Sequence, residues 1–305
     1  MHPTNHNHTS SGESRLLIAF LLAALTMLAE AFGGWLSGSL ALLADAGHML
    51  VDAFALSLAW AAAHFAQRPA DAKRSYGYAR LEVLIGYTNA LAQFALAIWI
   101  IVEAVSRLAA PEPVRSGWML GIACTGLAIN ALMLWALGTH DHEDLNAAGA
   151  RLHIFGDLLG SVGTVIAALA IASRGWIWTD PAVSIVVAVL MLRGAWTLLR
   201  RCAHVLLEGT PEGVAVADVV QSVMQHAAVE DVHHVHVWQL AGGRRVATLH
   251  ARLAEGSDIN ESLASIQTVL RERFCIAHAT IQIEAGKCVL ADCRDEPRER
   301  QTRTL

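Results

Sequence analysis

The sequence predicts a bundle of six transmembrane α-helices followed by a small α+β, ferredoxin-like domain. Hydrophobic residues make up 54% of the 305 residues and charged residues only 16%, with a mean hydropathy of +0.42. A soluble protein of this size does not need so many apolar side chains. The apolar residues form long runs between about Leu16 and Leu199, whereas the last hundred residues resemble a soluble domain.

Six apolar runs are long enough to cross the roughly 30 Å hydrocarbon layer, which needs about 20 residues in a helix. They are Leu16–Trp35, Leu40–Phe65, Leu81–Leu108, Trp118–Leu137, Ala147–Ser173 and Ile177–Leu199. Short polar stretches join them, among them Ser37-Gly38-Ser39 and Arg174-Gly175. A buried soluble helix bundle is the alternative, and six runs of this length argue against it.

Basic residues predict the orientation of the spans, because short cytoplasmic loops are enriched in Lys and Arg. The N-terminal side carries Arg15, Arg68, Lys73, Arg74, Arg80, Arg151, Arg200 and Arg201, and the opposite side only Arg107, Arg115 and Arg174, while Arg193 is assigned to neither side. We therefore expect both termini in the cytoplasm and a multi-pass protein of a bacterial inner membrane. The five cysteines show no CxxC spacing, which fits free thiols in a reducing compartment. The first residues show no cleavage site, so we expect no removable signal peptide.

After Glu208, the apolar residues recur with the spacings of short helices and strands, as is typical of a small soluble domain. Thr210-Pro211-Glu212 is typical of a capped helix start. The predicted strands are Val232–Leu240, Val246–Leu253 and Ala279–Glu284, with a Gly242-Gly243 hairpin after the first and a helix capped by Asp258 before the last. The order αββαβ indicates a ferredoxin-like half. The expected organisation is a polar tail over 1–14, a membrane domain over 15–201, a cytoplasmic domain over 208–286 and a charged tail over 287–305.

Two spans contain the same His-x-x-x-Asp pattern. The second span carries His48 and Asp52, and the fifth carries His153 and Asp157. Residues four apart share one helical face, so each pair directs two ligand atoms to one place. If the helices face each other, two imidazoles and two carboxylates suit a tetrahedral Zn²⁺ ion. Alternatively, each pair only satisfies itself by hydrogen bonding, but two identical pairs of ionisable residues inside spans favour a metal pathway.

Other polar residues also lie in or near the spans. Asp45, one turn before His48, is expected to support the ligands or to lie at a helix end. Hydrogen bonding between helices is the interpretation for the rest: Glu30, Glu82, Asn89, Gln93, Glu103 and Asn130.

Several long motifs resemble the zinc-type branch of the cation diffusion facilitator family. They are SLALLADAGHMLVDAFAL, RPADAKRSYGYARLE, LNAAGARLHIFGDLLGSVG, LLEGTPEGV, HVHVW and HATIQIE. The resemblance implies six transmembrane helices plus a cytoplasmic ferredoxin-like domain, working as a homodimer that exports metal in exchange for protons. It also implies a transport site at His48, Asp52, His153 and Asp157. Histidine at both first positions resembles the zinc-selective members, with Co²⁺ or Cd²⁺ as alternative cargo.

The chain departs from the family pattern in two loops. Some members bind a second ion after the second span through an Asp and two His; here Asp71 remains, but Arg74 and Tyr78 replace the histidines, so we expect no such site. The long His-rich loop of other members is reduced to residues 139–144, with His140 and His142. These two, with His2, His6 and His8, either hold Zn²⁺ weakly near the entrance or belong to a solvated loop and tail.

The cytoplasmic domain is rich in histidine. The resemblance implies a regulatory zinc site at His233, His250 and Glu284, although Gln282 stands where the family has a further histidine. In the predicted strand Val232–Leu240, His233 is expected on the opposite face from His234 and His236. The alternative is an ordinary polar sheet surface.

Protons compete with Zn²⁺ for imidazole and carboxylate ligands, so the sequence predicts antiport of Zn²⁺ and H⁺ across a lipid bilayer. Four protein ligands close the site, and no HExxH motif occurs, so the chain is not expected to be an enzyme. The net charge of −5 argues against nucleic acid as a partner. A membrane metal-sensing scaffold without flux remains the rival.

Overall fold

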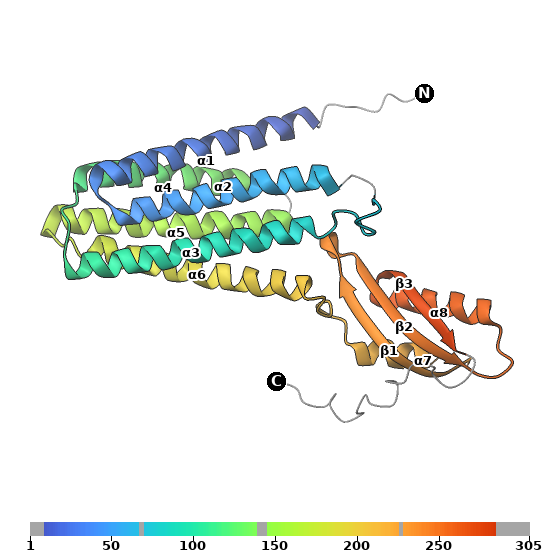
Figure 1. The fold of residues 1–305 in the computed structure, drawn as a ribbon. Coiled ribbons are helices and arrows are strands. Elements are labelled where there is room, and N and C mark those ends of the chain that lie inside the picture. The colour runs from blue at the N-terminus through green and yellow to red at the C-terminus, as the bar shows by residue number, and fades with distance from the viewer. Residues whose placement is uncertain (1–8, 67–69, 139–144, 226–227, 285–305) are drawn as a thin grey trace, which may run out of the picture. The chain divides into compact units, whose positions relative to one another are not determined.

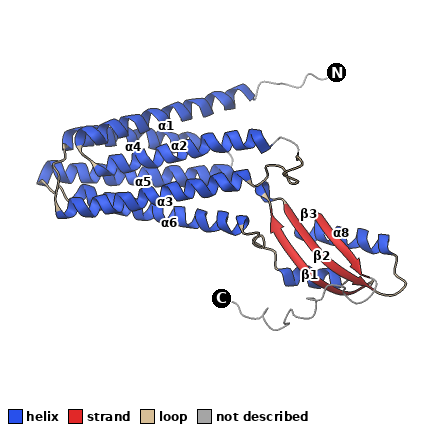
Figure 2. Ribbon diagram, viewed as in Figure 1, coloured by secondary structure: helices blue, strands red, loops and turns tan. Residues whose placement is uncertain are grey.

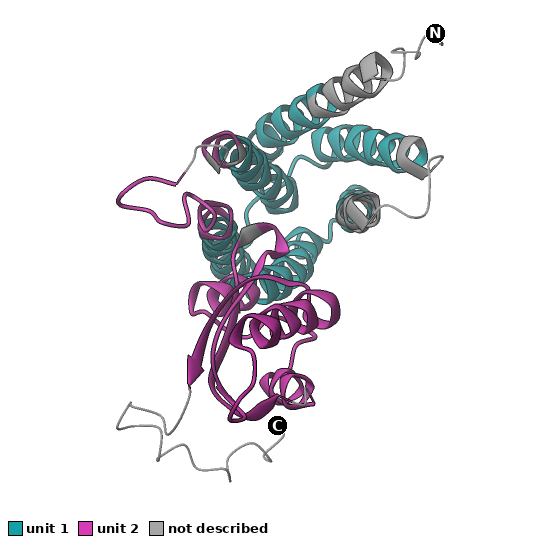
Figure 3. Ribbon diagram, turned by 90° about the vertical axis from the view of Figure 1, so that its right-hand side faces the viewer, with its two compact units in different colours: residues 1–60, 86–199 teal, residues 61–85, 200–305 magenta. Residues whose placement is uncertain are grey.

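A computed structural model describes residues 9–66, 70–138, 145–225 and 228–284. For residues 9–20, 63, 66, 136–138, 145–154 and 241 it describes the backbone alone. The chain divides into two compact units. One comprises residues 1–60 and 86–199, and the other residues 61–85 and 200–305, as Figure 3 shows by colour.

The predicted helical bundle is confirmed. Six long helices lie side by side in Figure 1. Their bounds are α1 Thr9–Ser37, α2 Leu40–Ala66, α3 Leu81–Ala109, α4 Ser116–Gly138, α5 Leu145–Arg174 and α6 Thr179–Leu206. The helices α2 to α6 are each long and apolar enough to span a membrane, and the described apolar part of α1 is Leu21–Ser37. The turns fall where glycine and proline predicted them, and Gly38 and Gly175 adopt φ values of +75° and +69°.

Many small side chains line the interior of the bundle, and many large apolar ones face outward. Ala44, Ala97 and Ala188 are fully buried beside Ile100, whereas the described tryptophans of the six helices are exposed. Helices in lipid associate through close packing of small residues, because lipid is as apolar as a leucine side chain. This inside-out distribution is what a membrane domain requires.

The start of α2 is fixed by an acid from α6. Asp180, which is fully buried, accepts hydrogen bonds from Ser39 Oγ at 2.6 Å, from the Leu40 N–H at 2.8 Å and from the Ala41 N–H at 3.3 Å. The first N–H groups of a helix have no partner within the helix, so this carboxylate caps α2 from a distant part of the chain. The cap sets the position of the helix that carries His48 and Asp52.

The second unit contains the predicted α+β domain. Its elements are α7 Val216–Met224, β1 Val229–Gln239, β2 Arg245–Leu253, α8 Ile259–Phe274 and β3 Ile276–Glu284, with a 3₁₀ turn over Ala241–Gly243. The sheet order is β1-β2-β3; β1 and β2 are antiparallel, and β2 and β3 are parallel (Figure 2). Parallel neighbours need a crossover connection, which α8 supplies.

One face of this sheet forms the core of the domain. Ala247, Leu249 and Ala251 are buried against Val219 of α7 and Ile266 of α8. The intervening residues of β2, Thr248, His250 and Arg252, are only partly buried on the other face, as the alternation predicted. The polar face is therefore available for a site.

The prediction of a capped helix at Thr210-Pro211-Glu212 was wrong. Helix α7 begins at Val216, and its N-cap residue Ala215 makes no side-chain cap. The N–H of Val214 instead donates to the Pro211 carbonyl in a turn, in which Gly213 has a φ of +79°. The expected Asp258 cap is present, since its side chain accepts from the N–H groups of Asn260 and Glu261.

Candidate functional site

The structure brings one His-x-x-x-Asp pair together with an acid of the other. His48 Nε2 lies 3.6 Å from Asp52 Oδ2, one turn later in α2, and 3.9 Å from Asp157 Oδ1 on α5. These three side chains are 16–20% exposed. Ligand atoms about 2.0–2.2 Å from a tetrahedral Zn²⁺ ion lie roughly 3.3–3.6 Å apart. The His48–Asp52 distance falls at the upper end of this range, and the His48–Asp157 distance is slightly longer.

The fourth predicted ligand is described by its backbone only. His153 lies in α5 one helical turn before Asp157, and its side chain is outside the described part of the chain. Positions four apart lie above one another on one face of a helix. The backbone of α5 thus places His153 on the same face as Asp157.

One of the two carboxylates beside His48, that of Asp52, is held by a residue of a third helix. Gln93 of α3 donates a hydrogen bond from its side-chain amide to Asp52 Oδ1. The sequence indicated Gln93 only as a contact between helices, because nothing in its local pattern shows that the partner is a candidate ligand. A neutral donor that holds a ligating carboxylate orients it without adding charge.

Two further acids are buried near Asp157. Glu30 of α1 is 2% exposed and Asp45 of α2 is 7% exposed, and both are close enough to Asp157 to interact with its charge. Among the described residues, Glu30 Oε2 has no hydrogen-bond partner, which differs from the interhelical bond that we expected. The expectation holds for Asn130, whose amide donates to Ser161 Oγ at 3.2 Å, whereas Glu103 pairs with Arg107 of its own helix at 2.9 Å.

The loop between α2 and α3 uses Asp71 for its own structure. Asp71 Oδ1 accepts from the N–H groups of Lys73 and Arg74 at 2.8 Å, and Arg74 Nη1 lies 3.3 Å from Asp71 Oδ2. The N–H of Lys73 and, next to it, Arg74 hold the pKa of the exposed Asp71 carboxyl below its usual value. The Arg74 guanidinium also covers the Tyr78 ring at 4.7 Å. Asp71 is thus engaged in a turn with Arg74, one of the two residues that stand in place of the family's histidines, and Arg74 in turn contacts the other, Tyr78.

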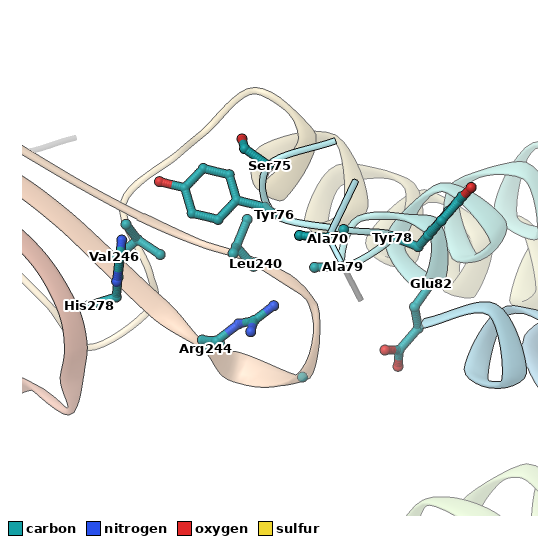
Figure 4. A pocket seen from close by; sticks show the side chains of 12 residues that line it. Ala70, Ser75, Tyr76, Tyr78, Ala79, Glu82, Leu240, Arg244, Val246 and His278 are labelled. Atoms are coloured by element: carbon teal, nitrogen blue, oxygen red, sulfur yellow. The ribbon is translucent and has the colours of Figure 1, made fainter. Parts of the chain in front are cut away.

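A cavity of about 700 Å³ lies within the second unit, between this loop and one end of the sheet. Tyr76, Leu240, Arg244 and Val246 are among the side chains that line it (Figure 4). Tyr76 and His278 meet edge to face with ring centroids 6.1 Å apart. Arg80 Nη2 pairs with Glu208 Oε1 at 2.8 Å nearby. The cavity has an aromatic and mixed-charge lining and does not contain a cluster of metal ligands.

The described residues contain one cluster whose ligand atoms lie within 4.8 Å of one another, and it consists of His233, His250 and Glu284. His250 Nδ1 is 2.9 Å from Glu284 Oε1, and His233 Nε2 is 3.3 Å from Glu284 Oε2. Glu284 is 7% exposed. Gln282 does not point away from this group; its side-chain amide donates to Glu284 Oε1 at 3.2 Å.

Hydrogen bonds satisfy only part of this cluster: His250 Nδ1 and Glu284 Oε1 are within hydrogen-bond distance, whereas, among the described residues, the second oxygen of Glu284 and Nε2 of His233 are not paired in this way. His233 Nε2 and Glu284 Oε2 are buried and close together, yet neither has a hydrogen-bond partner among the described residues. Their separation of 3.3 Å is about the edge of a tetrahedron of zinc ligands. On its other nitrogen, His233 Nδ1 lies 3.1 Å from Asp231 Oδ2, which fixes the tautomer that leaves Nε2 free to ligate.

The remaining histidines that the sequence singled out, His2, His6, His8, His140 and His142, lie outside the described residues.

Two family models match this chain. One, described as "Cation efflux transmembrane domain", matches residues 16–207, and the other, described as "Cation efflux protein, cytoplasmic domain", matches residues 211–286. The zinc transporter ZitB of Yersinia pestis is 45% identical over 285 residues, covering 93% of this chain and 91% of that protein. Escherichia coli ZitB is 44% identical over 297 residues, 95% of each chain. A cadmium, cobalt and zinc/H⁺-K⁺ antiporter of Bacillus velezensis is 38% identical over 288 residues, 92% of each chain.

Proposed function

This chain belongs to the cation efflux family, and we propose that it exports divalent metal ions, above all Zn²⁺, from the cytoplasm in exchange for protons. One observation carries the proposal: His48 Nε2 lies within 4 Å of carboxylates from two different membrane helices. The ligands are His48, Asp52, His153 and Asp157. The two aspartates supply the negative charge that makes a dehydrated divalent cation tolerable inside the bilayer.

Competition between protons and metal at these ligands provides the coupling. Zn²⁺ binds the neutral imidazole and the ionised carboxylate, so metal binding from the cytoplasm releases protons. On the opposite side, protons displace the ion from the same atoms. The name of the Bacillus velezensis relative, an antiporter with H⁺ and K⁺, supports exchange as the mode of transport. Alternating access follows from movement of the helices around one site near the middle of the membrane.

The proposed setting is a bacterial inner membrane with both termini in the cytoplasm and two copies of the chain in the working unit. The eight-to-three bias of basic residues described above supports the orientation. The name of the family model that matches the cytoplasmic domain, ZT_dimer, and the resemblance noted above support the homodimer. A resident ion at His233, His250 and Glu284 would stabilise the cytoplasmic domain and thereby regulate transport; the grouping of their ligand atoms within 4.8 Å of one another supports this part of the proposal.

Reconstitution into liposomes that contain a zinc-sensitive dye tests the proposal. We expect zinc entry that increases when the lumen is more acidic than the outside, and none with the Asp157→Asn variant, which keeps the shape of the side chain but not its charge. Zinc binding without flux would favour the metal-sensing scaffold. Flux that ignores the pH gradient would contradict antiport, and faster flux of Co²⁺ or Cd²⁺ than of Zn²⁺ would change the main cargo.

A further inference from the structure

A third histidine, His234, lies beside the cytoplasmic cluster, although regular alternation along β1 would place it on the opposite face of the sheet. In a regular strand, His233 and His234 point to opposite faces of the sheet. In β1, however, His233 pairs with His250, and the next described pair is His236 with Thr248, so three steps on β1 match two on β2. One extra residue is therefore inserted in β1, which is a β-bulge.

His234 is at this bulge, and its backbone is left-handed, with a φ of +49°. A positive φ is uncommon outside glycine, and histidine is one of the few residue types enriched there. The bulge turns the His234 side chain toward its two histidine neighbours. Its ring centroid lies 5.5 Å from that of His233 and 5.1 Å from that of His250, and the latter two rings are 5.3 Å apart.

The three imidazoles thus form a nearly equilateral triangle, and Glu284 closes it from β3. Its two carboxylate oxygens contact His250 Nδ1 at 2.9 Å and His233 Nε2 at 3.3 Å. We propose that His234 is the fourth ligand of this site, so that three imidazoles and one carboxylate from a single chain enclose one Zn²⁺ ion. The inference rests on the cytoplasmic metal site proposed above and is independent of transport.

The fourth ligand changes what the site can do. His233, His250 and Glu284 alone leave one tetrahedral position open to water, which is the arrangement of sites that exchange a ligand. With His234 the coordination is closed, which is the arrangement of structural zinc sites. His234 is not among the residues whose ligand atoms lie within 4.8 Å of one another, so its ring has to rotate to reach the ion. A rotation about side-chain torsions is fast and keeps the backbone in place.

This reading also explains the use of a strained position. A non-glycine residue in the left-handed region is energetically unfavourable, and such residues gather at ligand sites. Asp231 orients His233, and Gln282 holds Glu284, so the other ligands are already supported by neighbours. The bulge adds the missing imidazole to this supported set.

Co²⁺ binding to the full-length chain tests the proposal, because four-coordinate cobalt absorbs visible light far more strongly than five- or six-coordinate cobalt. The protein carries Asp52→Ala and Asp157→Ala to silence the membrane site and is purified without a histidine tag. The test variant is His234→Asn, because asparagine also tolerates the left-handed backbone. The matched control is His236→Ala, which removes an exposed histidine two residues further along β1.

We expect intense tetrahedral absorption with one Co²⁺ per chain in the parent and in His236→Ala. In His234→Asn the band should weaken, and the affinity should fall by about tenfold or more, with an unchanged metal-free melting temperature. Equal spectra and affinities of parent and His234→Asn would overturn the proposal, as would an equal loss in His236→Ala. A matching loss of metal-free stability in His234→Asn would also overturn it, since the residue would then act through folding. Zinc flux of the chain with its membrane site intact tests the transport function separately.

Discussion

The side-chain amide of Gln93 on α3 donates a hydrogen bond to Asp52 on α2, and so holds one of the two carboxylates beside His48. The contact joins two helices at the point where the cargo is expected to bind. A donor that orients a ligating carboxylate affects metal affinity even though it does not touch the ion.

Replacing Gln93 by alanine should therefore raise the KM for Zn²⁺ by about 10- to 100-fold, with a smaller effect on the maximal rate. Asn130→Ala is the matched control, because it also removes a buried amide that bonds across helices, here to Ser161. Initial rates of dye-detected uptake over a range of zinc concentrations measure both constants. An equal rise of KM in both variants would show that Gln93 acts only through general packing.

Removing either carboxylate of the membrane site should abolish transport while the protein still folds. Asp52→Ala and Asp157→Ala each delete a charged ligand and also relieve the cost of placing an acid inside a span. Expression and melting temperature should thus remain near those of the parent, and zinc uptake should fall to the level of empty liposomes. Uptake comparable to the parent in either variant would refute the four-ligand site.

The substitution His48→Asp should broaden the cargo toward Cd²⁺ or Mn²⁺ and reduce the preference for zinc. A carboxylate is a harder ligand than imidazole and suits ions of higher coordination number. The ratio of Zn²⁺ to Cd²⁺ flux, measured under one pH gradient, reports the change. If that ratio stays the same, selectivity resides in other residues.

Loss of the distant cap on α2 should destabilise the membrane domain. Asp180→Ala removes the acceptor of the Ser39 hydroxyl and of the Leu40 and Ala41 N–H groups. Leaving buried donors without a partner costs about 1–3 kcal/mol each, so the melting temperature in detergent should fall clearly. Ser184→Ala is the control, because Ser184 is also buried on α6 but bonds only to its own helix. Equal melting temperatures of the two variants would argue against the cap.

Zinc should stabilise the isolated cytoplasmic domain, from about Glu208 to Gly286, and tighten its dimer. The domain has its own apolar core around Leu249, so it is expected to fold alone. A ligand that binds only the folded form adds about 2.7 kcal/mol at a hundredfold excess over its dissociation constant. His250→Ala should reduce this stabilisation. Identical melting and sedimentation with zinc and with a chelator would show that the histidines are not a site.

Local periodicity was enough to predict much of the fold. The lengths of the apolar runs predicted six membrane helices, and alternation in β2 predicted that His250 lies on the polar face. The spacing of four residues placed His48 above Asp52 in the same way. These features follow from the 3.6 residues of a helical turn and the two residues of a strand repeat. Both periods can be recognised from neighbouring residues, without knowledge of the rest of the chain. The start of α7 could not be predicted from periodicity, because a turn at Pro211 stands where a helix cap was expected.

Which of these faces meet depends on the packing of segments that are distant in the sequence. No local pattern links Gln93 to Asp52, or Asp180 to the start of α2, because these pairs are separated by 41 residues and about 140 residues and depend on how the helices pack. The bulge in β1 could not be predicted either, because the one inserted residue moves His234 to the face of the sheet opposite to the one that regular alternation predicts. The ligand types and most of the helical and strand faces that carry them follow from the local sequence. Packing between distant segments determined which ligands share a site, because only a folded chain brings them within a few ångströms of one another.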